Sequence, residues 1–368
     1  ALERSPEELL EAVKAADVRG RGGAGFPAGT KWEFASRAAG ERKVIVANGD
    51  EGDPGSYIDK LLMEDNPALM LEGMALAGYA VGADHGFVLV RSEYPRSKPA
   101  LDAAVERARE EGWLGDRFDV TVIEGAGSYV VGEETALLSC LQGLRGTVSA
   151  RPPFPAERGV HGMPTVVNNV ETLCNVPFIA VHGADAYRSL SPPDATPGTK
   201  LVCFNERFVR PGMFEVPFGM TVRELCEDVA GGMVDGRAIK ALQIGGPLGG
   251  ILPASKLDTV FDFGPLAAEG CMVGHGGIVG FDDTTDMRAV ARHLLHFGAD
   301  ESCGKCFPCR IGLRRAHAMF ANGAPVERAR LEDLLEALEL GSLCAHGSGM
   351  PAPMRSLLAH FPDELGLA

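Results

Sequence analysis

Three closely spaced cysteines near the carboxyl end constrain this chain more than any other feature. Residues 301–310 read Glu-Ser-Cys-Gly-Lys-Cys-Phe-Pro-Cys-Arg, so Cys303, Cys306 and Cys309 stand at C-x2-C-x2-C spacing. Three thiolates at this spacing can converge from one tight loop on a single iron–sulfur cubane. Such a cluster needs a fourth ligand, and Cys344 is the nearest downstream thiol. The fold therefore has to bring the loop at 301–310 close to Cys344.

Two other uses of these cysteines fit the pattern less well. A structural zinc site usually has two separated C-x2-C pairs, whereas this chain has a run of three cysteines and one later cysteine. Disulfides fit least, because the other five of the nine cysteines lie singly in apolar or helical contexts. Lys305 and Arg310 also bring positive charge to a site whose ligands are all anions.

Composition narrows the class of protein. With 368 residues the chain is too long for one ordinary core, so two or three domains are expected. It has no run of 18 apolar residues, hence no transmembrane helix is predicted, and its net charge of −15 argues against a nucleic-acid or anionic-membrane surface. Nine cysteines without a paired framework indicate a reducing, cytoplasmic compartment. No signal-peptide pattern follows Ala1, and the sequence leaves open whether a segment precedes it.

A glycine-rich loop at 19–27, Arg-Gly-Arg-Gly-Gly-Ala-Gly-Phe-Pro, predicts a phosphate site. Its glycines permit positive φ and let backbone N–H groups crowd an anion. Arg21 and Lys31 add positive charge, and Phe26 and Phe34 offer surfaces for stacking. A flexible turn is the alternative. The loop is neither a Walker loop nor a standard Rossmann fingerprint, because no Gly-Lys-Ser/Thr follows it and a helix precedes it where a strand should stand.

Strands and helices alternate after this loop. Apolar strands are predicted at 43–48, 86–91 and 118–123, with helices at 69–81 and 96–111 between them. This order at this spacing predicts a parallel sheet of the doubly wound α/β type.

Polar side chains follow the strand ends, where open α/β sheets place ligand contacts. They could bind sugar hydroxyls or the edge of a polar ring at one cleft. Alternatives stay open: a solvated turn or a divalent-cation loop for the acidic residues after 43–48, and helix capping for Glu133, Glu134 and Asn169. The stiff segment at 151–155 could hold a cation and an aromatic ring. The candidates at strand ends are Asn48, Asp50, Glu51, Asp53, Tyr129, Glu133, Glu134, Asn168 and Asn169.

The second half of the chain has a different texture. A Pro- and Ser-rich linker at 191–198 precedes short strands, one helix and glycine-proline turns, which predict a small α+β domain. From residue 285 the pattern is helical, and a helical bundle can hold a cluster. The expected domains are 1–190, 191–284 and 285–368.

Three motifs, at 20–27, 132–136 and 301–310, resemble the NADH-oxidising flavoprotein subunit of respiratory complex I. That family includes the diaphorase subunits of NAD-linked hydrogenases and formate dehydrogenases. The resemblance covers nearly the whole chain. It implies a Rossmann-like FMN- and NADH-binding domain, then a ubiquitin-like (β-grasp) α+β domain, then a helical bundle carrying one [4Fe–4S] cluster.

The implied function is that of an NADH:acceptor oxidoreductase, or diaphorase, subunit. It exchanges hydride between NAD(H) and FMN and passes single electrons through the cluster to or from other iron–sulfur subunits. These include a thioredoxin-like [2Fe–2S] subunit and a catalytic donor or acceptor subunit. Gly-Asp-Pro-Gly at 52–55 looks more like the hydrogenase and formate dehydrogenase branch. Complex I members, the alternative parent, usually have Glu in place of Asp53 and Lys in place of Arg151.

The resemblance also assigns residues by motif. Hydride transfer needs no side-chain acid or base, so Glu134, Glu133 and Tyr129 are expected to act as positioning groups at the catalytic centre. Asp53 beside the adenosine ribose would repel a 2′-phosphate, which predicts a preference for NADH over NADPH. A scaffold subunit that binds no nucleotide is the rival, and the glycine loop argues against it. The FMN contacts would be Gly20, Arg21, Gly22, Ala24, Lys31, Asn48, Asp50, Glu51, Tyr129, Gly132, Glu133, Asn168, Asn169 and Thr172. The NADH contacts would be Phe26, Phe34, Asp53, Glu134, Arg151 and Phe154, and the cluster ligands Cys303, Cys306, Cys309 and Cys344.

Overall fold

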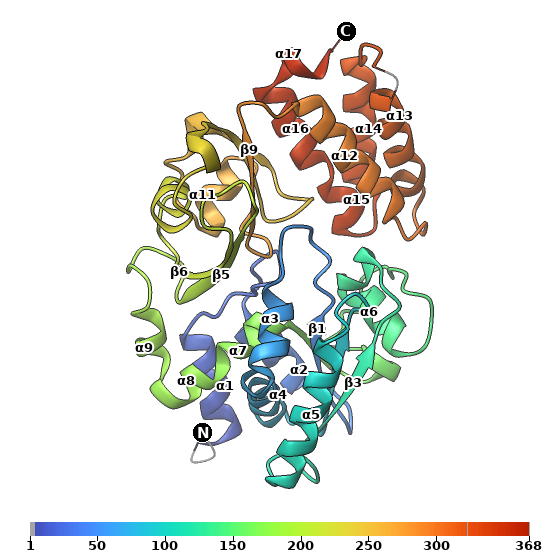
Figure 1. The fold of residues 1–368 in the computed structure, drawn as a ribbon. Coiled ribbons are helices and arrows are strands. Elements are labelled where there is room, and N and C mark those ends of the chain that lie inside the picture. The colour runs from blue at the N-terminus through green and yellow to red at the C-terminus, as the bar shows by residue number, and fades with distance from the viewer. Residues whose placement is uncertain (1–3, 322, 368) are drawn as a thin grey trace.

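A four-stranded parallel sheet organises the amino-terminal half of the chain (Figure 1). The computed structural model describes residues 4–321 and 323–367. The strand order is β3-β2-β1-β4, and all three pairings are parallel, which confirms the α/β prediction. The strands are β1 (Val44–Gly49), β2 (His85–Val90), β3 (Asp119–Glu124) and β4 (Thr165–Asn169).

Helices cover this sheet and supply most of its core. The most buried of them is α4, whose residues are chiefly Met, Leu, Ala and Gly. Gly73 in α4 lets the backbone of α7 approach closely, since a Cβ there would lie 2.1 Å from the Leu173 carbonyl oxygen. The helices are α1 (Pro6–Ala15), α2 (Ala28–Arg37), α3 (Ile58–Asp65), α4 (Pro67–Val81), α5 (Ser97–Glu110), α6 (Glu134–Leu141), α7 (Val170–Cys174), α8 (Val176–His182) and α9 (Ala184–Arg188).

A five-stranded mixed sheet follows, in the order β6-β5-β9-β7-β8. It packs on a short helix, as the predicted β-grasp domain requires, and its core holds Phe204, Phe218 and Phe261. Sequence patterns located β5 and β6 but not the last three strands. The strands are β5 (Thr199–Phe204), β6 (Gly212–Pro217), β7 (Ile239–Ile244), β8 (Ile251–Pro253) and β9 (Gly277–Asp282), and the helices are α10 (Val222–Glu224), its π-helical continuation η3 (Leu225–Val229) and α11 (Phe263–Ala268).

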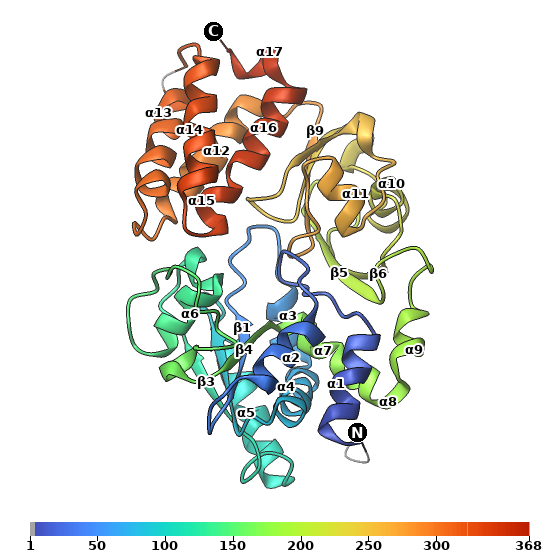
Figure 2. The same ribbon diagram turned by 180° about the vertical axis from the view of Figure 1, so that it is seen from behind.

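The last part is a helical bundle, as predicted, with a core of its own. Figures 1 and 2 show the bundle above the parallel sheet, with the loop after β1 rising between the bundle and the second sheet. No helix among the described residues has the length and apolarity needed to cross a bilayer. The elements are α12 (Met287–Asp300), the π-helical turn η6 (Pro308–Gly312), α13 (Leu313–Ala321), α14 (Arg328–Gly341), α15 (Ala345–Gly349), α16 (Pro351–His360) and α17 (Pro362–Leu365).

Candidate functional site

The glycine loop closes on itself and is held between the two sheets. The Gly20 N–H donates to the Phe26 carbonyl oxygen at 3.0 Å, which closes the loop at its base. Gly23 pairs with Gly274, which lies just before β9 of the second sheet. The loop that the sequence predicted for phosphate therefore depends on both sheets for its shape.

Two of its positions admit only glycine. A Cβ at Gly22 would lie 2.8 Å from the Cβ of Asn169, at the end of β4. Gly25 has φ +69°, and a Cβ there would lie 2.4 Å from the ring of Phe263. Gly22 and Ala24 are exposed, so the loop backbone is open on its outer side. This arrangement of exposed backbone fits the crowding of N–H groups around an anion.

Arg21 does not offer its charge to a ligand, and this expectation was wrong. Its side chain is completely buried, and the guanidinium also lies 4.9 Å over the ring of Phe218. The guanidinium ties the loop to the start of the second domain, while the Arg21 N–H donates to Thr172 Oγ1 at 2.9 Å. Its acceptors are the carbonyl oxygens of Arg19 (2.8 Å), Thr199 (3.1 Å) and Pro197 (3.2 Å) and the Tyr187 hydroxyl (2.7 Å).

Lys31, Glu134 and Arg151, all predicted site residues, come together. Lys31 Nζ lies 3.3 Å from Glu134 Oε2, and Arg151 Nη1 lies 2.9 Å from Glu134 Oε1. Lys31 also donates to the Val167 carbonyl oxygen at 2.9 Å, which anchors it to β4. Arg151 Nη2 lies 3.6 Å from Glu133 Oε1. The result is a half-buried group of alternating charges that can contact the polar groups of a nucleotide.

Helix capping explains two residues for which it was an open alternative. Glu133 is the N-cap of α6, and its Oε2 accepts from the backbone N–H of Thr135 at 2.9 Å and of Ala136 at 3.0 Å. Asn169 is the N-cap of α7, and its Oδ1 accepts from the Thr172 N–H at 3.1 Å. Both side chains thus fix helix starts beside the loop. Whether they also contact FMN stays a prediction.

Asn48 and Asn168 brace the ends of β1 and β4. Asn48 Nδ2 donates to the Gly132 carbonyl oxygen at 2.8 Å, and its Oδ1 accepts from the Asp50 N–H at 3.1 Å. Asn168 Oδ1 accepts from Trp32 Nε1 at 2.8 Å. Trp32 on α2 is completely buried, and no sequence signal had connected it with the site.

Glu51 lies inside the protein, so the solvated-turn alternative is wrong for it. It is 2% exposed, and its carboxylate caps the start of α3. Its Oε1 accepts from Ser56 Oγ at 2.7 Å and the Ile58 N–H at 2.6 Å. Its Oε2 accepts from the Lys60 N–H at 3.0 Å and the Tyr94 hydroxyl at 3.1 Å. These bonds give the side chain a structural role in placing the loop after β1.

Asp50 differs from Glu51 because one of its oxygens has no partner. It is 6% exposed, and Oδ2 accepts no hydrogen bond from any described residue. Burial raises the pKa of Asp50 to about 7, and the charges of Glu93 and Glu301 add to the rise while Arg91 opposes it. A buried acceptor without a donor is rare in proteins and indicates a partner from outside the chain. Asp50 thus fits a polar group of a bound cofactor.

His275 is a central residue that sequence reasoning missed. Its Nδ1 lies 3.2 Å from Glu51 Oε1 and its Nε2 lies 2.9 Å from Asp59 Oδ2. These three side chains lie close enough to hold a metal ion. However, each carboxylate faces a different ring nitrogen, and one imidazole binds a metal ion through only one of them. Burial lowers the pKa of His275, but the charges of Asp59 and Glu51 outweigh it and raise the pKa to about 9. The group is therefore an imidazolium between two carboxylates.

This imidazolium joins the second domain to the loop end of α7. Asp59 Oδ2 also accepts from Asn169 Nδ2 at 2.6 Å, and Asn169 packs against Gly22 of the glycine loop. Behind it, the buried Lys200 pairs with Glu171.

We expect His275→Gln to lower the free energy of unfolding by on the order of 3 kcal/mol at pH 6, because two buried carboxylates lose their counter-charge. A raised folded-state pKa means that this stabilisation is complete below the unfolded value of 6.5 and is lost as pH rises through about 9. Urea unfolding of both proteins from pH 6 to 10 measures the difference. Exposed His293→Gln is the control, and a difference that does not change with pH would contradict the assignment.

Three predicted aromatic residues have exposed rings. Phe26, Phe34 and Phe154 are 49%, 57% and 53% exposed, and they lie in the glycine loop, on α2 and just after Arg151. Rings of this size are available for stacking on a planar ligand.

Tyr129 links the nucleotide side to the bundle. Its ring meets Phe297 of α12 edge to face at 5.0 Å and lies 5.5 Å from the ring of His346. Its N–H, at the start of turn η1 (Tyr129–Gly132), donates to Glu301 Oε2 at 3.0 Å. Burial and the nearby Asp53 raise the pKa of Tyr129 well above its ordinary value, so the hydroxyl stays neutral.

Asp53 lies at the junction with the second sheet. A Cβ on Gly246 would lie 2.5 Å from its carboxyl carbon, so the two chain segments are in close contact. Burial raises the pKa of Asp53, although the charge of His275 opposes the rise. Its predicted contact with the adenosine ribose stays untested.

The four predicted cluster cysteines lie together at the foot of the bundle. Cys303 packs against the group that contains Cys344, the N-cap of α15. Burial raises the pKa of Cys309 to about 12, and charges on the other three thiols add to the rise. Tetrahedral Zn²⁺ with Zn–S bonds of about 2.3 Å needs sulfurs about 3.8 Å apart. In the described part of the chain, no three cysteine sulfurs lie within 4.8 Å of one another, so the spacing suits a larger cluster better than one zinc ion.

Comparison with known proteins agrees with this arrangement. Residues 13–178 match the Nuo51 FMN-binding domain, and residues 289–367 match the NADH-ubiquinone oxidoreductase-F iron-sulfur binding region. NADH-quinone oxidoreductase-F 2 of Rhizobium meliloti is 41% identical over 376 residues, which cover 98% of this chain and 89% of that protein. The chain belongs to the NADH-quinone oxidoreductase-F family. The resemblance seen in the three motifs is thereby confirmed, and with it FMN, a [4Fe–4S] cluster and NAD(H) as cofactors.

Other members of the oxidoreductase-F family come from different enzyme complexes. The HndC component of an NADP-reducing hydrogenase from Solidesulfovibrio fructosivorans is 41% identical, with 99% of this chain and 76% of that protein covered. The NADH-quinone oxidoreductase-F of Escherichia coli is 40% identical, with 98% and 84% covered. A crystal structure of an NAD⁺-reducing [NiFe]-hydrogenase in the H2-reduced state superposes with a TM-score of 0.91 at 38% identity. It covers 99% of this chain, which spans only 63% of that solved chain.

Proposed function

We propose that the chain is an NADH:acceptor oxidoreductase subunit. It exchanges hydride between NAD(H) and FMN and passes single electrons through the [4Fe–4S] cluster to or from iron–sulfur partner subunits. One observation carries most weight: Glu301, which begins the cluster loop, accepts the hydrogen bond from Tyr129 in turn η1 at 3.0 Å. The nucleotide side and the cluster side therefore meet through a direct contact.

The chain's own residues position and hold the cofactors. FMN supplies the exchange between hydride and single electrons when it is bound. The outer face of the glycine loop, Asp50 and the ends of β1 and β4 would hold it, with Lys31 as the available cation in place of Arg21. Glu134, held between Lys31 and Arg151, would position the nicotinamide nucleotide, and the three exposed phenylalanines would stack on its planar groups.

For the parent complex we favour an NAD-linked hydrogenase or a soluble NAD-dependent formate dehydrogenase over respiratory complex I. Asp53 and Arg151 replace the residues that complex I members usually carry, and relatives from both kinds of complex are about equally similar to this chain. Partners would be iron–sulfur subunits, including a thioredoxin-like [2Fe–2S] subunit. We propose a cytoplasmic location, supported by nine cysteines that are all free thiols.

A visible absorption spectrum of the purified protein tests this function. We expect a flavin band over broad iron–sulfur absorption, and we expect NADH added under argon to bleach both. Addition of NAD⁺ in place of NADH is the control and should change nothing. A broad band without flavin and without a response to NADH would instead support a scaffold subunit that holds only the cluster.

A further inference from the structure

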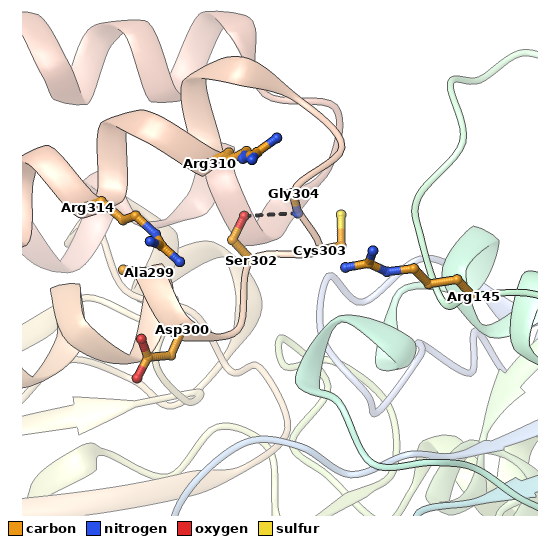
Figure 3. Close-up of a pocket in the computed structure, with 8 residues that line it drawn as sticks. All are labelled: Arg145, Ala299, Asp300, Ser302, Cys303, Gly304, Arg310 and Arg314. Atoms are coloured by element: carbon orange, nitrogen blue, oxygen red, sulfur yellow. Dashed lines mark hydrogen bonds between the residues drawn. The ribbon is translucent and has the colours of Figure 1, made fainter.

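Beside the cluster loop lies a pocket of about 260 Å³ that is walled mainly by arginines (Figure 3). Arg310 and Arg314 come from the start of the bundle helix that follows the loop, and Arg145 comes from the turn after α6. Cys303, a predicted cluster ligand, forms part of the wall, and Figure 3 shows Arg145 reaching toward it. The pocket therefore opens directly onto the outer side of the cluster loop.

The positive charge of this pocket is not balanced by the protein. Many arginines of the chain bind carboxylates closely, as Arg355 does to Glu339 at 2.7 Å. In the described part of the chain, no salt bridge within 4.0 Å joins Arg145, Arg310 or Arg314 to a carboxylate. Asp300 is the one acid in the wall, and it pairs with His296 at 3.1 Å. In a chain of net charge −15, such a concentration of unpaired cations needs an explanation.

Exposed apolar side chains stand next to these arginines in the chain. Leu144 precedes Arg145 and is 64% exposed, and Ile311 follows Arg310 and is 44% exposed. Phe307, between two cluster cysteines, is 81% exposed. Aromatic residues and arginines are enriched at protein interfaces, whereas a ring this exposed contributes nothing to the fold. We call these residues the cluster-loop surface: Leu144, Arg145, Phe307, Arg310, Ile311 and Arg314.

We propose that the cluster-loop surface docks the electron-exchanging partner, and that this partner is an iron–sulfur protein with an acidic contact face. The inference rests on the proposed function, because only a chain that exchanges electrons needs a partner here. Cys303 in the pocket wall places the cluster immediately behind the surface, which gives a short path for an electron. Acidic side chains would complement the unpaired arginines and steer the encounter. The net charge of −15 disfavours nucleic acid as the occupant.

An acidic [2Fe–2S] ferredoxin serves as the probe. Two reduced ferredoxins, which give one electron each, and one proton convert one NAD⁺ to NADH, and absorbance at 340 nm under argon follows the reaction. We expect Arg145→Gln/Arg314→Gln to lower the second-order rate constant at least about tenfold at low salt. The difference from wild type should shrink as sodium chloride screens the charges. Arg310 is left unchanged because it follows Cys309.

A matched variant controls for net charge. Arg315 and Arg330 line a separate hollow between α13 and α14, so Arg315→Gln/Arg330→Gln removes the same charge from the same bundle. This variant should react at the wild-type rate. Leu144→Asp, which adds a repelling carboxylate beside Arg145, should slow the reaction at low salt without touching the cluster. Equal slowing by both double variants would overturn the docking surface.

Two further outcomes are distinguishable. If millimolar phosphate inhibits wild type far more than chloride of equal ionic strength, and the Arg145→Gln/Arg314→Gln variant does not respond, the pocket is a small-anion site and the partner proposal is overturned. If NADH fails to bleach the flavin in wild type, the proposed function itself fails. Bleaching by NADH that is normal in every variant, combined with a salt-independent ferredoxin rate, would reject only the docking surface.

Discussion

Cys303→Ser is expected to leave the protein without its cluster while the flavin remains reducible by NADH. Cys303 has few core contacts compared with Cys309, which packs inside the bundle, so the fold should survive. A serine hydroxyl is a poor replacement for the thiolate that holds iron. We expect iron to fall from about four atoms to less than about one per chain. Oxidation of reduced ferredoxin coupled to NADH formation should fall at least about 100-fold, because only the cluster exchanges single electrons with a partner.

Cys271→Ser is the control for this variant. Cys271 is also buried but lies in the second domain, away from the other cysteines of the loop. It should retain iron, sulfide and flavin at wild-type levels. Retention of a full complement of iron by the Cys303→Ser protein would remove Cys303 from the ligand set.

Lys31→Glu is expected to release FMN. Lys31 is the available cation beside the glycine loop, since Arg21 is committed elsewhere, and its ammonium group lies 3.3 Å from Glu134. A carboxylate in its place would face Glu134 and Glu133 and would repel a phosphate. We expect the dissociation constant for FMN to rise at least about 100-fold, which corresponds to about 2.7 kcal/mol. Flavin fluorescence during titration of the flavin-free protein measures it.

Lys98→Glu makes the same charge change on α5, where Lys98 pairs only with Asp102 in the next turn. It should bind FMN as wild type does, and Lys31→Gln should lie between the two. Wild-type flavin affinity in the Lys31→Glu protein would mean that the phosphate lies elsewhere.

Local signals made the motifs predictable. The cysteine spacing and the glycine loop each lie within ten residues, and their chemistry does not depend on distant parts of the chain. Helix capping by Glu133 and Asn169 was foreseen as an alternative because a capping residue and the helix it starts are neighbours in sequence. Whether such a side chain also meets a ligand depends on what lies opposite, which only the fold determines.

Non-local contacts explain the failures. Arg21 was expected to face a phosphate, but its partners Tyr187 and Thr199 lie 166 and 178 residues further along the chain. His275 is 216 residues from Asp59, and nothing near either one marks the pair. The strands β7 to β9 escaped detection because they are short apolar segments set among glycines, where periodicity is weak.

The grip of the second domain on the glycine loop has a consequence for how the protein is made. The loop acquires its shape only when Gly23 meets Gly274 and Arg21 meets the start of β5. A ribosome must therefore have synthesised about three quarters of the chain before a flavin-binding surface exists, and the last cluster cysteine, Cys344, emerges later still. Both cofactors must enter a nearly complete polypeptide. The order of their insertion during maturation is then decided by the cell's supply of iron, sulfide and FMN rather than by the order of translation.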